Sequence, residues 1–130
     1  MRSLLVLAVL VLLTGCQSEP PPKYSSNSNT DSPCARVVSA IGYAELMLSP
    51  KGQEEGQNFE PAVLGRIAET RGINAEFGGR LPAEARTAAA EVERTAAGLS
   101  IADTPHDRQV ELLRQYRAAT DEIRKHCAGK

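Results

Sequence analysis

From residue 32 onward, apolar residues recur every three or four positions, the spacing that places them on one face of an α-helix. The first such segment begins at Pro33, where Ser32 can cap the helix and proline suits the first turn, and it stops before Pro50. Its apolar face consists of Val37, Val38, Ile41, Ala44 and Leu48. The stretch 51–58 that follows has no apolar residue, so we expect an exposed loop there.

A second helix is expected to open at Phe59 and Pro61 and to end at the Gly78–Gly79 pair, with both glycines in left-handed backbone conformations. Its apolar residues are Val63, Leu64, Ile67, Ala68, Ala75 and Phe77. Gly65 and Gly72 weaken a helix by up to about 1 kcal/mol each relative to alanine. We therefore expect a neighbouring helix to approach closely at these two glycines.

A third helix is expected to begin at Pro82 and to end around Gly98. Its face is made of small residues that should pack tightly, namely Ala85, Ala88, Ala89, Val92, Ala96 and Leu99. A fourth helix is expected to open with Thr104 as cap, Pro105 in the first turn and acidic Asp107. Its buried face is predicted to be Val110, Leu113, Tyr116, Thr120, Ile123 and Cys127. Four helices with short connections predict an all-α, up-down-up-down four-helix bundle over residues 33–130.

The chain begins with a basic Arg2 and an apolar run from Leu4 to Leu13. Crossing a bilayer takes about 20 apolar residues, so this run is too short to span a membrane. The small residues Thr14 and Gly15 suit a peptidase cleavage site. We therefore expect residues 1–15 to be a signal peptide that is removed.

The sequence Leu13-Thr14-Gly15-Cys16 resembles the lipobox of bacterial lipoproteins. The resemblance implies diacylglycerol on the Cys16 sulfur and a location at the extracytoplasmic face of the cell membrane. Residues 16–32 would then be the lipidated cysteine and a disordered tether, because this stretch is rich in Pro, Ser and Asn and has no aliphatic residue. A plain spacer is the expectation, and a tether that is glycosylated or touches peptidoglycan is the alternative.

Once Cys16 carries lipid, Cys34 and Cys127 are the two cysteines left to pair in an oxidising compartment. They lie at the start of the first helix and at the end of the fourth, which share one pole of an up-down-up-down bundle. We therefore expect a disulfide that stabilises the domain by about 4 kcal/mol in the chain-entropy account. Two free thiols are the alternative.

The charge balance, 15 Lys and Arg against 16 Asp and Glu, gives no electrostatic footprint for nucleic acid. No glutamate has a histidine three residues later, as a di-iron bundle would need. Glu122 and His126, and separately His106, are expected to be solvated surface groups, and no metal or cofactor is predicted. No nucleophile elbow or phosphate-binding glycine loop is present, so we expect no enzymatic activity.

Tyr43 and Tyr116 are expected on the apolar faces of the first and fourth helices. Two interpretations stay open for them: they line an apolar pocket, or they are core tyrosines whose hydroxyls reach the edge of the core. Their placement matters because a pocket between two helices is a typical small-molecule site.

A Pro-Cys opening, an all-helical domain and a cysteine close to the C-terminus resemble the secreted mycobacterial haemophore-type domains, which bind haem. The ectodomain also resembles small actinobacterial helical lipoproteins that have no assigned activity. We expect a protein-interaction or cell-envelope structural module, anchored to the membrane by lipid on Cys16 and contacting an envelope protein. A haemophore-like or other carrier of a small apolar ligand is the alternative.

Overall fold

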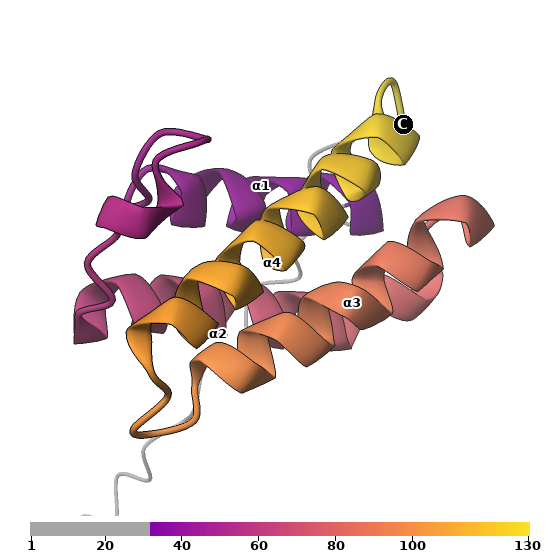
Figure 1. The fold of residues 1–130 in the computed structure, drawn as a ribbon. Helices are drawn as coiled ribbons and strands as arrows, with labels where there is room; N and C mark the ends of the chain where they lie inside the picture. The colour runs from indigo at the N-terminus through magenta and orange to yellow at the C-terminus, as the bar shows by residue number, and fades with distance from the viewer. Residues whose placement is uncertain (1–31) are drawn as a thin grey trace, which may run out of the picture.

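A computed structural model describes residues 32–130 of the chain, and all of its regular elements are helical (Figure 1). The four α-helices are α1 (Pro33–Glu45), α2 (Pro61–Phe77), α3 (Ala83–Leu99) and α4 (His106–Cys127). Two short 3-10 helices, η2 (Glu54–Gly56) and η3 (Gly78–Arg80), lie before and after α2. The expected signal peptide, Cys16 and all but the last residue of the expected tether lie outside the described residues. None of the described helices is both long and apolar enough to cross a membrane.

Helix α1 begins as predicted. The Ser32 hydroxyl oxygen accepts a hydrogen bond from the Ala35 amide at 3.1 Å, and Pro33 occupies the first turn. The helix ends at Glu45 and does not continue to Pro50. After Glu45 the chain continues in tighter turns, in which the Met47 amide donates to the Ala44 carbonyl at 3.0 Å. The Ser49 amide then donates to the Gln57 side chain at 2.6 Å.

Helix α2 is less apolar on its buried side than the sequence pattern predicts. Its buried residues are Val63, Ile67, Thr70 and Asn74, and these follow one stripe at spacings of three and four. Ala68 and Ala75 lie off this stripe and are exposed, so their predicted place in the core is wrong. The polar stripe residues are bonded: the Thr70 hydroxyl lies 3.2 Å from the Ala40 carbonyl oxygen, and the Asn74 amide donates to the Ala89 carbonyl at 2.8 Å.

The structure corrects the predictions made for four glycines, namely Gly65, Gly72, Gly78 and Gly79. Gly78 keeps a right-handed backbone, with φ −58°, and continues into η3 instead of ending α2 in a left-handed turn. Gly79 also lacks a positive φ, which among the described glycines is found at Gly52 and Gly129. A Cβ added at Gly65 or Gly72 would meet open space, so no helix approaches there. The close approach occurs at Gly98, where a Cβ would lie 3.0 Å from a methyl carbon of Leu112.

Helices α3 and α4 carry the predicted faces and lie side by side (Figure 1). The predicted stripe of α4 is buried along its whole length, and so is that of α3 apart from half-buried Ala88. The N-terminus of α4 differs in detail, because the Thr104 hydroxyl donates back to the Ile101 carbonyl at 2.8 Å instead of capping the helix. Helix α2 packs on both α1 and α3, and α1 also contacts α4, so the helices enclose one core.

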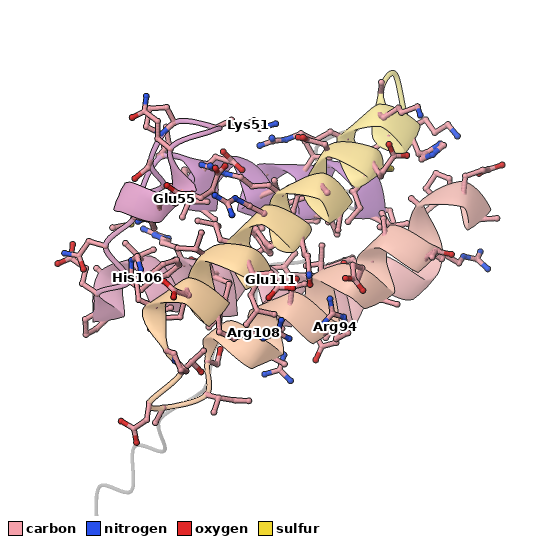
Figure 2. All side chains as sticks on the ribbon, viewed as in Figure 1. Lys51, Glu55, Arg94, His106, Arg108 and Glu111 are labelled. Carbon is pink, nitrogen blue, oxygen red and sulfur yellow. A yellow bond between two sulfur atoms is a disulfide. The ribbon has the colours of Figure 1, made fainter. Side chains whose placement is uncertain are left out.

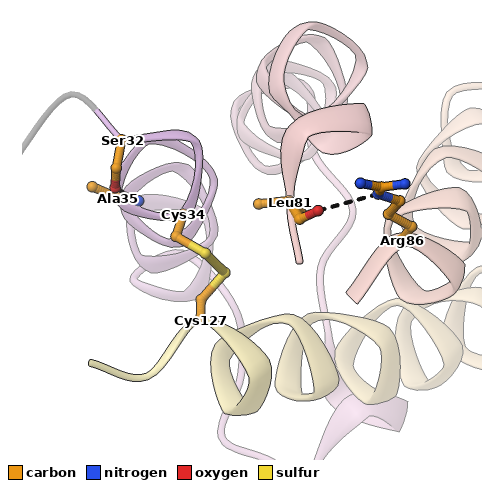
Figure 3. Close-up of a disulfide and its surroundings, with 6 residues drawn as sticks. All are labelled: Ser32, Cys34, Ala35, Leu81, Arg86 and Cys127. Carbon is orange, nitrogen blue, oxygen red and sulfur yellow. Dashed lines mark hydrogen bonds between the residues drawn. A yellow bond between two sulfur atoms is a disulfide. The ribbon is translucent and has the colours of Figure 1, made fainter. Parts of the chain in front are cut away.

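The predicted disulfide is present. Cys34 at the start of α1 and Cys127 at the end of α4 are bonded, with their α-carbons 5.4 Å apart although 93 positions separate them in sequence (Figure 3). This distance lies within the range of about 4.4–6.8 Å that disulfides require. The bond therefore ties the first and last helices of the domain together at one end.

Replacing Leu113 with alanine tests the buried face of α4. Leu113 has no exposed surface, so Leu113→Ala should lower the free energy of unfolding by about 2–5 kcal/mol through lost burial and a residual cavity. Urea denaturation monitored by circular dichroism measures this change. Leu46, which is 81% exposed, provides the matched control, and Leu46→Ala should change stability by less than about 0.5 kcal/mol. Equal effects of the two variants would mean that the face is misassigned.

Candidate functional site

The two tyrosines proposed to line a pocket lie in opposite environments. Tyr43 is 59% exposed, whereas Tyr116 has no exposed surface. The prediction that Tyr43 lies on the apolar face of α1 is wrong, because that face is set by Ile41 and Ala44. At about 100° per residue, Tyr43 is turned far from Ile41 and points outward. Tyr116 is a core residue, as the second interpretation holds, although its hydroxyl is buried instead of reaching the edge.

The Tyr116 hydroxyl is buried and makes no hydrogen bond of ordinary geometry within residues 32–130. Burial raises the pKa of Tyr116 to about 12, with the nearby Thr70 side chain acting in the opposite direction. The group therefore stays neutral at physiological pH and contributes bulk to the core.

Both histidines lie at the surface of the domain in different settings. His106 is exposed, its Nε2 lies 3.2 Å from the Gln57 carbonyl oxygen, and its ring makes a T-shaped contact with the ring of Phe59. His126 is half-buried, with Nε2 3.4 Å from a Glu122 carboxylate oxygen. Within the part of the chain that the structure describes, no three His, Cys, Asp or Glu residues come together as a metal site would require.

An ion-pair cluster that the sequence analysis missed connects α4 to the loop after α1. Arg117 of α4 is almost fully buried, and its Nη1 lies 2.6 Å from a carboxylate oxygen of Glu54, which is also buried. The same guanidinium donates to the Ser49 carbonyl and lies 3.8 Å from Glu45. The expectation that the whole 51–58 loop is exposed is therefore wrong at Glu54 and Gln57, which fold inward.

The cluster holds the loop in place through charge-assisted hydrogen bonds. The Arg117 guanidinium, with help from backbone amides, lowers the pKa of Glu54 from 4.5 to about 2. Arg117 lies four residues after Leu113 and three before Thr120, on the helix face that is buried. That spacing was the signal in the sequence that could have identified it as a buried arginine.

This pair predicts a pH dependence of stability. The pKa of Glu54 is lower in the folded than in the unfolded state, so its stabilisation is present above about pH 4.5 and is lost as pH falls toward 2. Urea midpoints of the wild type and Glu54→Gln should therefore converge over this interval. The neighbouring variant Glu55→Gln, at a side chain that is 84% exposed, controls for the loss of one surface carboxylate. A difference between wild type and Glu54→Gln that stays constant from pH 7 to pH 2 would contradict the assignment.

The candidate site is an open groove of about 480 Å³ between α3 and α4, called here the alanine groove. Three alanines, a threonine, a glutamine and three glutamates line it: Ala88, Ala118, Ala119, Thr87, Gln115, Glu84, Glu91 and Glu122. The groove exists because small side chains occupy the outer edge of the α3–α4 contact. Larger residues at these positions would fill it.

The carboxylates of the groove differ in their partners. Arg94, one turn after Glu91 on α3, bonds the Glu91 carboxylate, and this hydrogen bond lowers the pKa of Glu91. Arg94 also reaches across to the Gln115 side chain of α4 at 2.6 Å, and Gln115 in turn donates to Glu111 at 3.0 Å. Arg94 on α3 and Glu111 on α4 are both labelled in Figure 2, and with Gln115 they bridge the two helices beside Glu91. At the other end of the groove lie Glu84 and Glu122.

A second surface feature lies at the end of α1. Tyr43, Leu46 and Met47 are exposed by 59%, 81% and 36% of their surfaces. Their spacing of three and four residues places them close together on the outward side of the helix end. These residues form a small exposed apolar cluster.

Comparisons of the chain with protein families, with curated proteins and with solved structures find no match. The arguments for function therefore rest on the sequence pattern and on the surfaces described above.

Proposed function

We propose that the chain is a lipid-anchored, extracytoplasmic module that acts in protein interaction or cell-envelope structure. The Leu13-Thr14-Gly15-Cys16 sequence supports the anchor, since lipid on Cys16 would hold the protein at the membrane. The bond between Cys34 and Cys127 supports an oxidising compartment, because stable disulfides are rare in the cytosol. The disulfide also supports an up-down-up-down order of the helices, in which the start of α1 and the end of α4 meet at one pole.

The alanine groove is the observation that carries the interaction role. It is an open surface groove with a mainly apolar floor, and it runs along two packed helices. A partner helix can lie in such a groove and bury the floor, as in the recurring helix-in-groove mode of recognition. The exposed Tyr43, Leu46 and Met47 offer a second contact surface for an envelope partner.

A carrier of a small apolar ligand is the second candidate. The volume of the groove, about 480 Å³, is within the range of small-molecule sites, which supports this alternative. Ligand sites usually enclose most of the ligand, whereas this groove is open to solvent along its length. The interaction role fits the open shape better.

The anchor is tested by replacing Cys16. Cys16→Ser should abolish acylation and lipobox-dependent cleavage, because the modified sulfur is lost, so that the unprocessed precursor accumulates. Mass spectrometry of the N-terminal peptide and membrane fractionation measure the two effects, with Ser18→Ala as the matched control that keeps the sulfur. An unmodified Cys16 in the wild-type protein would remove the anchor from the proposal.

The interaction role is tested by photo-crosslinking in the cells that make the protein. A photoreactive residue at position 118, in the groove, should form an adduct with another envelope protein, because a bound partner buries this position. The same residue at position 68, which is exposed on α2 away from the groove, serves as the control and should give no such adduct.

A hemin titration of the purified protein separates the two candidates. A saturable Soret change at stoichiometric hemin, together with the absence of adducts at position 118, would favour the carrier and overturn the interaction role. Adducts at position 118 with no Soret change are the result expected from the proposal.

A further inference from the structure

We infer that the alanine groove receives a basic amphipathic helix of a protein partner. This inference deepens the proposed interaction role and rests on it. The inference rests on the shape of the groove and on its charge, which favours a cationic partner and disfavours other occupants.

The shape of the groove matches two turns of a helix. On α3 the lining positions Glu84, Ala88 and Glu91 recur at spacings of four and three, and on α4 Gln115, Ala119 and Glu122 do the same. Seven residues of helix span about 10 Å, so each wall presents about two turns. Alanine side chains let the backbone of a third helix approach closely, and a line of apolar side chains on that helix would rest on them.

The charge of the groove calls for a cationic partner. All three ionisable lining residues are glutamates. Their partners lie outside the lining: Arg94 pairs with Glu91, and Lys125 and His126 lie beside Glu122. Glu84 takes part in no ion pair within residues 32–130. Exposed pairs of neighbouring residues on one helix contribute little, so lysines or arginines of a partner can replace them.

The same charge argues against other occupants. If two copies of the chain paired groove to groove, glutamates would face glutamates, and like charges across an interface are unfavourable. An anionic lipid surface, or a ligand carrying carboxylates as haem does, meets the same repulsion. A helix with small apolar residues along one line and Lys or Arg on both sides of it satisfies both the floor and the walls of the groove.

The probe for this inference is a stapled helical peptide of about 14 residues, with an alanine line flanked by lysines. Stapling is needed because helices of this length are marginal in water. The peptide is titrated into the 15N-labelled full chain in detergent micelles, and amide chemical shifts locate the site even when binding is weak. We expect shifts confined to α3 and α4 around the groove, weaker binding at high salt, and no shifts with a peptide carrying glutamate in place of lysine.

Paired variants test the two features of the groove separately. Glu84→Gln should weaken peptide binding about threefold, because one favourable charge pair is lost, while Glu76→Gln on the exposed side of α2 leaves binding unchanged. Ala118→Trp should weaken binding by about tenfold or more, because the indole fills the groove, while Ala68→Trp does not. Unfolding midpoints of all four variants verify that the domain is intact.

Each outcome decides the inference. The inference would be overturned if the lysine and glutamate peptides bound equally, or if the lysine peptide caused no chemical-shift changes or changes centred on Tyr43 and Met47. It would also be overturned if the protein formed a concentration-dependent dimer whose chemical-shift changes map to the groove. Failure of the interaction role itself looks different, since the lysine peptide would bind the groove while photo-crosslinking at position 118 gives no adduct in cells.

Discussion

Burial of one face of α4 is the constraint on which the rest of the structure depends. Its stripe from Val110 to Cys127 is the longest among the described helices, and it meets each neighbour through a different interaction. Against α3 the contact is tight packing of Leu112 over Gly98, and against α1 it is the covalent bond of Cys127. Against the loop after α1 it is the charged bond of Arg117 to Glu54. Rotating α4 about its axis would break all three of these contacts. The buried face of this one helix can therefore specify how the helices are arranged.

Much of the helical structure could be predicted because it depends on neighbours three and four positions away. The stripes of α3 and α4 and the cap of α1 at Ser32 are local patterns of this kind, and the disulfide followed from the cysteine count. The errors arose where tertiary contacts decide. Whether an arginine such as Arg117 is buried depends on a carboxylate brought by a distant loop, and whether Gly65 or Gly98 meets a neighbour depends on where the helices cross.

The candidate site was harder to predict than the fold. Glu84, Glu91 and Glu122 are ordinary exposed helix positions in the sequence, and nothing in their spacing alone distinguishes them from solubilising charges. They become one feature only when the register of α3 against α4 is known, because two separate helices supply the two walls. A surface made from two helices has no continuous motif, so the sequence could suggest an interaction role but not its location.

The small residues of α3 connect stability to the proposed role. Alanines on its inner side, such as Ala85 and Ala89, let the helices pack closely, but each buries little apolar surface. A domain with this kind of core gains from a restraint on the unfolded chain, which the bond between Cys34 and Cys127 supplies. With that restraint, the outer alanines, Ala88 of α3 and Ala118 of α4, need not be enlarged to strengthen the fold. The groove that these alanines leave open is therefore not filled by the protein's own side chains, and it stays accessible to the proposed partner helix.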